Sequence, residues 1–287
     1  MSHSKMTRRS LLLGIPAVAC GISQLASGQE PRGNFREPVY RVSNKSDNRR
    51  DNQVVAGEHP LAPALRVAET GLKRIEDNIQ DYQCTLVKRE RIGGKLLDHE
   101  FMDAKIRHNP FSVYLSFKNP ASVRGREVLY VEGQNNNNLM AHEGGALLKL
   151  VTVNLNPTSS LAMRNQRYPI TDIGVKNLVQ RLIEVAKEDM QFGECEVKFT
   201  NGAKINGRVC TLIEVVHPVP RSNFRFHKAH IFIDDQLQVP VRFASWDWPA
   251  QNGGEAPLLE EYTYLDMKVN NGFTDADFDS NNPNYKF

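Results

Sequence analysis

The first regular pattern in the chain is a run of apolar residues at steps of three and four. The run consists of Leu65, Ala68, Leu72, Ile75 and Ile79. These positions share one face of a helix, so the spacing predicts an amphipathic helix that ends near Asn78. A second helix is predicted from Gly174 to Met190, with Thr171 or Asp172 as its N-terminal cap. Its apolar stripe comprises Leu178, Leu182, Ile183 and Val185.

Short strand-like runs fill the chain between and after the two helices. Those before the second helix cover residues 82–92, 101–107, 111–117, 126–132, 138–142 and 146–153. Those after it cover residues 194–200, 208–216, 226–233, 239–246 and 259–269. Turn signals such as Gly93-Gly94 and Asn109-Pro110 separate the runs, which is typical of antiparallel strands. Long helices do not alternate with the strands, and this argues against a doubly wound parallel sheet.

This order of elements predicts one α+β domain over residues 61–287. A long antiparallel sheet must twist and curl, so we expect a strongly curved sheet with both helices on its concave face. A curled sheet that does not close leaves a groove, whose inner face must be apolar or filled. The candidate lining residues are Val113, Leu115, Phe117, Leu129 and Val131. The alternative is that these side chains pack directly on the two helices.

The first 28 residues follow the order of a secretory signal peptide. Lys5, Arg8 and Arg9 precede a short apolar run over 11–19, and small residues at 26–28 offer a cleavage site. The apolar run is shorter than the roughly 20 residues that a bilayer span needs. The sequence around the two arginines also resembles the twin-arginine export motif. We therefore expect an exported protein of the periplasm or cell envelope.

The four cysteines raise two separate questions. Cys20 ends a sequence, Ala17-Val18-Ala19-Cys20, that resembles a lipobox, and a lipidated Cys20 would tether the protein to a membrane. The alternative is that Cys20 is removed with the signal. The other three cysteines allow at most one internal bridge, and Cys195 with Cys210 is the local candidate. The pairing depends on whether the hairpin turns at Asn201-Gly202 or at Asn206-Gly207, because the second turn places the two sulfurs far apart.

Composition narrows the possible functions. Residues 29–60 are rich in polar and charged residues and in proline, so we expect a flexible linker there. The chain has 36 basic and 33 acidic residues, but three of the basic ones lie in residues 1–28, which contain no acid. The remaining 33 basic residues equal the 33 acidic ones. A nucleic-acid binder needs a basic excess on one face, so nucleic-acid binding is not expected.

Short motifs that mark common catalytic sites are absent from the sequence. There is no GxSxG, GxxxxGK(S/T) or GxGxxG. His99-Glu100 and His142-Glu143 begin like the HExxH zinc motif. However, Asp103 and Ala146 stand where the second histidine is required, and both pairs lie in predicted strands rather than helices. The pairs are therefore interpreted as surface polar residues, and no cofactor is expected.

Two further clusters resemble metal sites without meeting their geometry. His227 and His230 lie an odd number of residues apart on one predicted strand, so they point to opposite faces and cannot converge with His217. All three are interpreted as ordinary, partly exposed histidines. Aspartates at 275, 277 and 279 begin like a calcium loop, but Ser280 and Lys286 replace its required Gly and Glu. This run is predicted to cap a turn, and no metal site is expected.

The second half of the chain has a recognisable succession of strands and turns. It includes Asn206-Gly207-Arg208, Ala229–Asp234, Glu261–Met267, Asn271–Asp275 and Asn282–Tyr285. This succession resembles an exported bacterial family known as domain of unknown function 1571, over about residues 65–287. More distantly, it is similar to the LolA/LolB/RseB superfamily of lipoprotein carriers and envelope-stress sensors. The resemblance implies a half-open β-barrel, plugged by helices, that holds acyl chains or another apolar ligand.

Three functions are compatible with these patterns. The leading hypothesis is a non-catalytic envelope protein that binds a lipid, a lipoprotein or another apolar ligand in the groove. The alternative is an envelope sensor or scaffold that binds a protein partner through the outer sheet face or through Trp246 and Trp248, which could also touch a membrane surface. The third is a secreted hydrolase built from scattered Asp, Glu and His residues.

Overall fold

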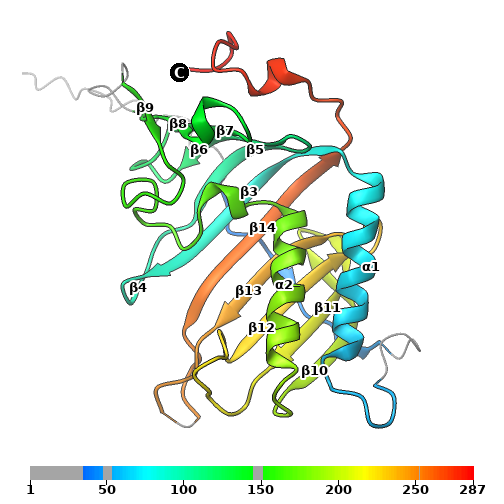
Figure 1. Ribbon diagram of the computed structural model, residues 1–287. Coiled ribbons are helices and arrows are strands. Elements are labelled where there is room, and N and C mark those ends of the chain that lie inside the picture. Colours follow the sequence, from blue (N-terminus) through cyan, green and yellow to red (C-terminus); the bar gives the residue numbers. More distant parts are fainter. Residues whose placement is uncertain (1–34, 48–53, 145–150, 252) are drawn as a thin grey trace, which may run out of the picture. The chain divides into compact units, whose positions relative to one another are not determined.

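Two helices lie across one face of an antiparallel sheet in the part of the chain that the computed structural model describes (Figure 1). This part comprises residues 35–47, 54–144, 151–251 and 253–287. The predicted signal peptide, with Cys20, lies outside the described residues. In the described part the sheet has 14 strands, and neighbouring strands pair in antiparallel fashion. The prediction of an antiparallel sheet with two helices is confirmed.

The strand bounds agree with the predicted runs to within a few residues for most strands. The strands before the second helix are β1 (Tyr40–Arg41), β2 (Lys45–Ser46), β3 (Asp81–Ile92), β4 (Lys95–Leu96), β5 (Glu100–His108), β6 (Phe111–Asn119), β7 (Glu127–Val131), β8 (Leu139–His142) and β9 (Thr152–Leu155). Those after it are β10 (Glu196–Ile205), β11 (Arg208–Val216), β12 (Lys228–Asp234), β13 (Pro240–Trp246) and β14 (Leu258–Val269). The predicted strand 146–153 falls largely outside the described residues.

The order of the strands differs from their order along the chain. Across the sheet it runs β1-β10-β11-β12-β13-β14-β3-β5-β6-β7-β8-β9, with β2 also beside β10 and β4 beside β3. The pairing of β14 with β3 therefore joins two sets of strands that are distant in sequence. Its register places Val269 opposite Tyr82 at one end and Glu260 opposite Glu90 at the other.

Two glycine turns were candidates for the hairpin that joins β10 to β11. The chain turns at Asn206-Gly207, where both residues have positive φ (44° and 89°), as a tight type I′ hairpin requires. The register shifts between Thr200 and Ala203, so Asn201-Gly202 forms an irregularity within β10 instead of a turn. Cys195 consequently precedes β10, whereas Cys210 lies opposite Ala203.

The cysteines in the described part of the chain are free. Cys84, Cys195 and Cys210 are all buried, and none is joined in a disulfide. The Asn206-Gly207 turn explains why Cys195 and Cys210 do not pair, because it separates them along the hairpin. Burial raises the pKa of the Cys195 and Cys210 thiols to about 12, so both stay protonated and unreactive at neutral pH.

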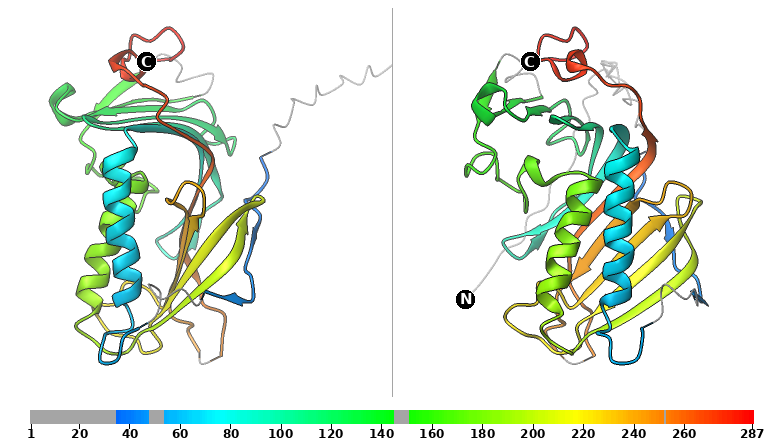
Figure 2. Two further views of the ribbon diagram at one scale, coloured as in Figure 1. Left: turned by 90° about the vertical axis from the view of Figure 1, so that its right-hand side faces the viewer. Right: turned by 45° about the vertical axis from the view of Figure 1, so that its right-hand side comes forward.

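Both predicted helices are confirmed as α1 (Ala62–Asn78) and α2 (Val175–Asp189). They lie side by side over one face of the sheet (Figure 2). Lys176 pairs with Glu76 at 3.2 Å and Lys187 with Glu69 at 2.9 Å, so the two helices run in opposite directions. Their apolar faces pack against the sheet and bury Ile75, Val175 and Val179.

The cap of α2 differs from the predicted one. Thr171 and Asp172 belong to a short 3-10 turn, and the N-cap is Gly174, with φ of 107°. The hydroxyl of Tyr82 on β3 accepts a hydrogen bond of 2.9 Å from the backbone N–H of Val175. A Cβ at position 174 would come within 2.9 Å of that hydroxyl, so only glycine lets the sheet approach so closely. A strand tyrosine thus replaces the expected side-chain cap and attaches α2 to β3.

Part of the predicted linker is ordered against the sheet. Residues 35–47, here called the N-terminal strap, include β1 and β2, which pair with the edge strand β10. The Tyr40 ring lies 4.4 Å from the Arg242 guanidinium and 6.0 Å from the Phe232 ring. The strap crosses the sheet face opposite the helices (Figure 2). The expectation of a flexible linker over 29–60 therefore does not hold for the strap, which pairs with β10 and whose Phe35 and Tyr40 rings contact Phe101 and Phe232.

An ion-pair network lies beside the strap on the same outer face. Glu261 accepts a hydrogen bond of 2.5 Å from Arg242 and lies 2.8 Å from Nε2 of His99. His99 also lies 3.3 Å from Glu37 of the strap. Burial alone would raise the pKa of Glu261, but the His99 hydrogen bond and the Arg242 charge outweigh it and lower the pKa to about 2.

We expect the Glu261 network to stabilise the fold at neutral pH and to lose this effect in acid. Because the folded pKa is depressed, the contribution is fully present above the unfolded pKa of about 4.3 and disappears as pH falls towards 2. Replacing Glu261→Gln should lower the unfolding free energy by about 1.5–3 kcal/mol at pH 7. Urea unfolding of the wild-type protein and the Glu261→Gln variant at pH 7, 5 and 3 measures this difference in unfolding free energy. A difference in unfolding free energy that stays constant down to pH 3 would contradict the assignment. The control is Asp98→Asn, at an exposed position between β4 and β5.

The C-terminal segment, residues 271–287, covers the outer face of β6 and β7. Tyr285 stacks on Tyr114 with ring centroids 3.9 Å apart. Asp81 holds the start of the segment by accepting hydrogen bonds from the backbone N–H groups of Asn271 (2.6 Å) and Phe273 (3.0 Å). Thr274 and Asp277 form a capping box on a 3-10 turn, so the prediction that the aspartate run caps a turn is confirmed.

Candidate functional site

Two cavities flank α2 between the helices and the sheet, within the part of the chain that the structure describes. The small cavity, of about 490 Å³, lies between α1 and strands β10, β11 and β12. The large cavity, of about 1230 Å³, lies on the other side of α2 against β3, β5, β6, β7 and β8. Leu182, Val185 and Phe226 line both cavities. The position of α2 thus divides one space above the sheet into two.

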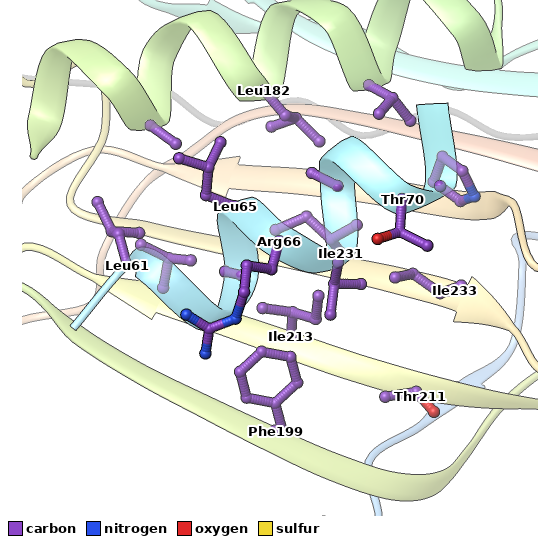
Figure 3. A pocket seen from close by; sticks show the side chains of 18 of the residues that line it. Leu61, Leu65, Arg66, Thr70, Leu182, Phe199, Thr211, Ile213, Ile231 and Ile233 are labelled. Carbon is purple, nitrogen blue, oxygen red and sulfur yellow. The ribbon is translucent and has the colours of Figure 1, made fainter. Parts of the chain in front are cut away.

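The small cavity is mainly apolar. Leu61 at the N-cap of α1, Leu65 on α1 and Leu182 on α2 lie above Phe199 and Ile213 of the sheet (Figure 3). Two polar side chains at its edge are engaged with other residues, since Arg66 pairs with Glu58 and Thr211 donates a 2.9 Å hydrogen bond to Asp235. An occupant would therefore meet hydrocarbon over most of the cavity wall.

The large cavity has an apolar floor and a roof made of loop and helix. Met102, Leu115, Phe117, Val128 and Ala141 form much of the floor, on β5 to β8. The roof consists of α2 and residues 156–169, here called the cover loop, which follow β9. Its volume is at or above the range of about 300–1,000 Å³ that is usual for small-molecule sites.

The pairing register places three of the five predicted lining residues on the helix side of the sheet and the other two on its outer side. Leu115 and Phe117 line the large cavity, and Val113 is fully buried in the core on the same sheet face. Leu129 lies opposite Tyr114, and Val131 lies opposite Ser112.

Opposite residues of an antiparallel pair share a face, so Leu129 and Val131 point away from the helices. They pack with Phe278 of the C-terminal segment. For these two residues the predicted placement on the groove side is corrected, and Val128 lines the cavity in their place.

Charged side chains interrupt the apolar wall of the large cavity. Lys88, Glu90, Glu100, Glu260 and Tyr262, here called the polar cluster, lie on three adjacent strands and all line the cavity. The Lys88 ammonium lies 3.4 Å from Glu90 and 3.1 Å from Glu100. The Tyr262 hydroxyl donates a hydrogen bond of 2.5 Å to Glu90. The sequence analysis missed this cluster, because its members are up to 174 positions apart.

The polar cluster also anchors the cover loop. Arg167 donates a hydrogen bond of 2.9 Å from Nε to Glu260 and another of 3.2 Å from its backbone N–H to Glu90. The Tyr168 hydroxyl donates to Glu260 at 3.2 Å, and Gln166 accepts a hydrogen bond from Lys88. The loop is thus tied to the buried carboxylates through three consecutive residues.

Burial controls the protonation of this network. Burial raises the pKa of Glu260 above its usual value, although the Arg167 charge opposes the shift. Burial also raises the pKa of Tyr168 to about 12 and that of Tyr262 well above its ordinary value. Both tyrosine hydroxyls therefore remain protonated donors at neutral pH, as the hydrogen bonds to Glu90 and Glu260 require.

Each histidine that was considered for a metal site has its own local partner. His217 is fully buried, 3.3 Å from Asp189, and His230 is buried too, which corrects the expectation that these two side chains are partly exposed. His227 contacts the His217 carbonyl at 2.9 Å, and His230 lies 2.6 Å from Glu214. Across the described ranges, no three His, Cys, Asp or Glu side chains gather as metal ligands would.

The two HExxH-like pairs lie in or beside strands, and three of their four side chains are largely buried, not on the surface as interpreted from the sequence; the Glu143 side chain is 39% exposed. The side chains of His99 and Glu100 are 10% and 15% exposed. His142 is buried on β8, with Nδ1 3.1 Å from the Thr152 hydroxyl. His99 and His142 have partners on neighbouring strands, as buried polar groups usually do, and Glu100 forms an ion pair with Lys88.

The two tryptophans lie at the end of β13 and are partly exposed. The Trp246 ring meets His230 edge-on at 4.8 Å, and the Lys228 ammonium lies 4.8 Å from its centroid. The Trp248 indole donates a hydrogen bond of 3.1 Å to the His217 carbonyl. Local contacts thus hold both rings, and a partner-binding or membrane-binding role for them stays a prediction.

Replacing Arg167→Ala should loosen the cover loop. The change removes two side-chain hydrogen bonds and leaves the buried Glu260 without its cationic partner, at a cost of about 1.5–3 kcal/mol. Hydrogen exchange of the backbone amides in residues 156–169 should rise by about tenfold. Arg164→Ala in the same loop is the control, because its side chain is exposed. Equal exchange in the two variants would show that the polar cluster does not hold the loop.

Comparisons with known proteins give a family and several solved structures. A family model described as "Protein of unknown function (DUF1571)" matches residues 79–287. No curated protein matches the sequence. Within the described ranges, no helix is both long and apolar enough to cross a membrane.

The similarity of three solved structures to this chain is given by sequence identity, coverage and TM-score. A LolA superfamily protein from Nitrosomonas europaea is 13% identical, over 74% of this chain and 97% of that one, with a TM-score of 0.32. The Mycobacterium tuberculosis lipoprotein LppX is 15% identical, over 73% and 98%, with a TM-score of 0.40. MucB in the Pseudomonas aeruginosa MucA/MucB complex is 13% identical, over 75% and 60%, with a TM-score of 0.43.

Proposed function

This chain belongs to the DUF1571 family, and we propose that it is a non-catalytic protein of the cell envelope that binds an apolar ligand, such as a lipid acyl chain, beside α2. The observation that carries the proposal is the large cavity of about 1230 Å³, whose floor is formed by apolar side chains of four adjacent strands. We propose in addition that the sheet is strongly curved and half-open, and that its curvature forms the groove that holds the ligand.

The lining of the two cavities suits a long, flexible hydrocarbon. The small cavity is mainly apolar, and the two cavities share Leu182, Val185 and Phe226 beneath α2. An acyl chain that begins in the large cavity would reach the small one by displacing few side chains. Burying its methylene groups supplies about 0.8 kcal/mol each before the cost of ordering the chain, so a long chain suffices for stable binding.

The polar groups at the cavity favour binding over catalysis. Glu90 and Glu260 accept hydrogen bonds from Tyr262, Arg167 and Tyr168, so two of the three carboxylates in the polar cluster are occupied, and the third, Glu100, is paired with Lys88. The buried thiols have pKa values raised by desolvation and are poor nucleophiles. The hydrolase alternative therefore has the least support.

The envelope location rests on the N-terminal sequence. Residues 1–28 have the order of a signal peptide, and lipidation of Cys20 would add a membrane tether. Both features lie outside the described residues, so the location is part of the proposal. Intact-mass measurement of the mature protein tests it, because cleavage and acylation each change the mass by a distinct amount.

Replacing Leu182→Trp should block ligand binding, because this side chain lines both cavities. The probe is N-phenyl-1-naphthylamine, an uncharged apolar dye whose fluorescence rises in apolar sites. We expect saturable binding to the wild-type protein and at least about tenfold weaker binding to the variant. The measurement is a fluorescence titration, with urea unfolding to confirm that the variant is folded.

Lys187→Trp is the matched control for this experiment. It introduces the same side chain on the same helix, at an exposed position that lines neither cavity. Its dye affinity should stay within about twofold of the wild type. A wild-type protein that does not bind the dye, or two variants that bind it equally well, would refute the proposed site.

A further inference from the structure

The polar cluster stands out because it brings more negative than positive charge into an otherwise apolar wall. Among the residues that the structure describes, Glu90, Glu100 and Glu260 form ion pairs with two cations, Lys88 and Arg167. The side chains of Lys88, Glu90 and Glu260 are each less than 10% exposed, and that of Glu100 is 15% exposed. At this degree of burial, water screens their charges poorly, so the cluster influences whatever lies against it.

The register shows that the cluster forms one continuous patch. Lys88 lies opposite Glu100 on β5 and opposite Tyr262 on β14, while Glu90 lies opposite Glu260. Opposite residues in antiparallel pairs share a face, so all five side chains project to the helix side of the sheet. The patch therefore lies at the β3 and β14 end of the large cavity, next to its apolar floor.

The patch has spare capacity to accept hydrogen bonds. A buried Oε2 atom of Glu100 makes no hydrogen bond in the described part of the chain, although it forms an ion pair with Lys88 at 3.1 Å. A carboxylate offers about four lone-pair positions, and a single ion pair leaves most of them unused. A group that donates hydrogen bonds would complete the site, whereas a second anion would meet carboxylate oxygens.

Other cations around the large cavity do not alter this balance. Arg126, Arg181 and Arg225 also line it, but each already pairs with a carboxylate. Their partners are Glu143 at 3.0 Å, Glu184 at 2.8 Å and Glu188 at 3.0 Å. Arg164 is exposed on the cover loop, where solvent screens its charge.

We propose that the large cavity selects amphipathic ligands with an uncharged, hydroxyl-bearing head, such as monoacylglycerols, over ligands with an anionic carboxylate or phosphate head. This inference rests on the proposed function and names the class of ligand for the same site. The acyl chain lies on the apolar floor, and the head hydroxyls donate hydrogen bonds to the Glu100 carboxylate, because the three N–H groups of Lys88 already face Glu90, Glu100 and Gln166.

The preference for uncharged over anionic heads does not depend on whether Glu260 is ionised. Burial raises the pKa of this carboxyl, and the Glu90 charge adds to the shift while Arg167 opposes it. Two carboxylates and two cations then remain, and the patch has no net positive charge to attract an anion. An anionic head would still lose its water next to Glu90 and Glu100, which is unfavourable in a buried site.

The test is displacement of N-phenyl-1-naphthylamine by ligands that share one chain length. The series is monolaurin, methyl laurate, laurate and dodecyltrimethylammonium, each below its micellar concentration at pH 7.5. We expect monolaurin to displace the dye at a concentration at least about tenfold lower than laurate, with methyl laurate in between because it lacks both charge and hydroxyl donors.

Two variants locate the selectivity in the patch. Glu100→Gln removes one carboxylate with little change of shape, and it should narrow the preference for monolaurin over laurate to within about threefold. Glu132→Gln, on an exposed turn outside the cavity, should leave the preference unchanged. Because the ligand series on the wild-type protein needs no variant, misfolding of Glu100→Gln would not prevent the test.

The outcomes separate this inference from the proposed function. If the wild-type protein does not bind the dye, the proposed function fails. If the dye binds but laurate displaces it as well as monolaurin does, the cavity binds apolar chains and the selectivity against anionic heads is refuted. If dodecyltrimethylammonium displaces it as well as monolaurin does, negative charge alone attracts the head and the preference for a hydroxyl-bearing head is refuted. An unchanged preference in a folded Glu100→Gln variant would also overturn the inference, because the patch would then not be its source.

Discussion

The antiparallel pairing of β3 with β14 is the interaction on which the rest of the structure depends. It joins residues 82–90 to residues 260–269 and so unites strands β10–β14 with strands β3–β9 in one sheet. Contacts at such sequence separation carry a loop-closure cost that only extensive burial offsets. Without this pairing, the described chain would expose two strand edges near the middle of its apolar face.

The same pairing builds the candidate site. It places Glu90 beside Glu260 and Lys88 beside Tyr262, which creates the polar cluster and the anchor of the cover loop. Tyr82 at the other end of β3 caps α2 and fixes where that helix crosses the sheet. Since α2 separates the two cavities, β3 determines both the charges on the cavity wall and the space available for a ligand.

Segments from the two ends of the described chain cover parts of the sheet face opposite the two cavities. The N-terminal strap covers part of the outer face with Tyr40, and the C-terminal segment covers another part with Phe278 and Tyr285. Both segments carry aromatic side chains that fit directly on the sheet. The two helices cross the opposite face, and the small and large cavities remain on either side of α2.

The sequence by itself determined the features that depend on local spacing. Apolar residues at helical steps identified α1 and α2, and Gly93-Gly94 identified a hairpin, because both signals lie within a few residues of each other. Tertiary structure alone decided which Asn-Gly turn closes the β10–β11 hairpin, since both turns are locally suitable. It also placed Leu129 and Val131 on the outer face.

The polar cluster shows most clearly what local sequence cannot predict. Leu86, Lys88 and Glu90 are spaced two residues apart and share one face of β3. Two charged residues on one strand face are equally compatible with a face exposed to solvent. Only the pairing with β14 and β5 surrounds these charges with partners and turns them towards a cavity. Local sequence determines which elements form, whereas the face that each element buries depends on neighbours distant in the chain.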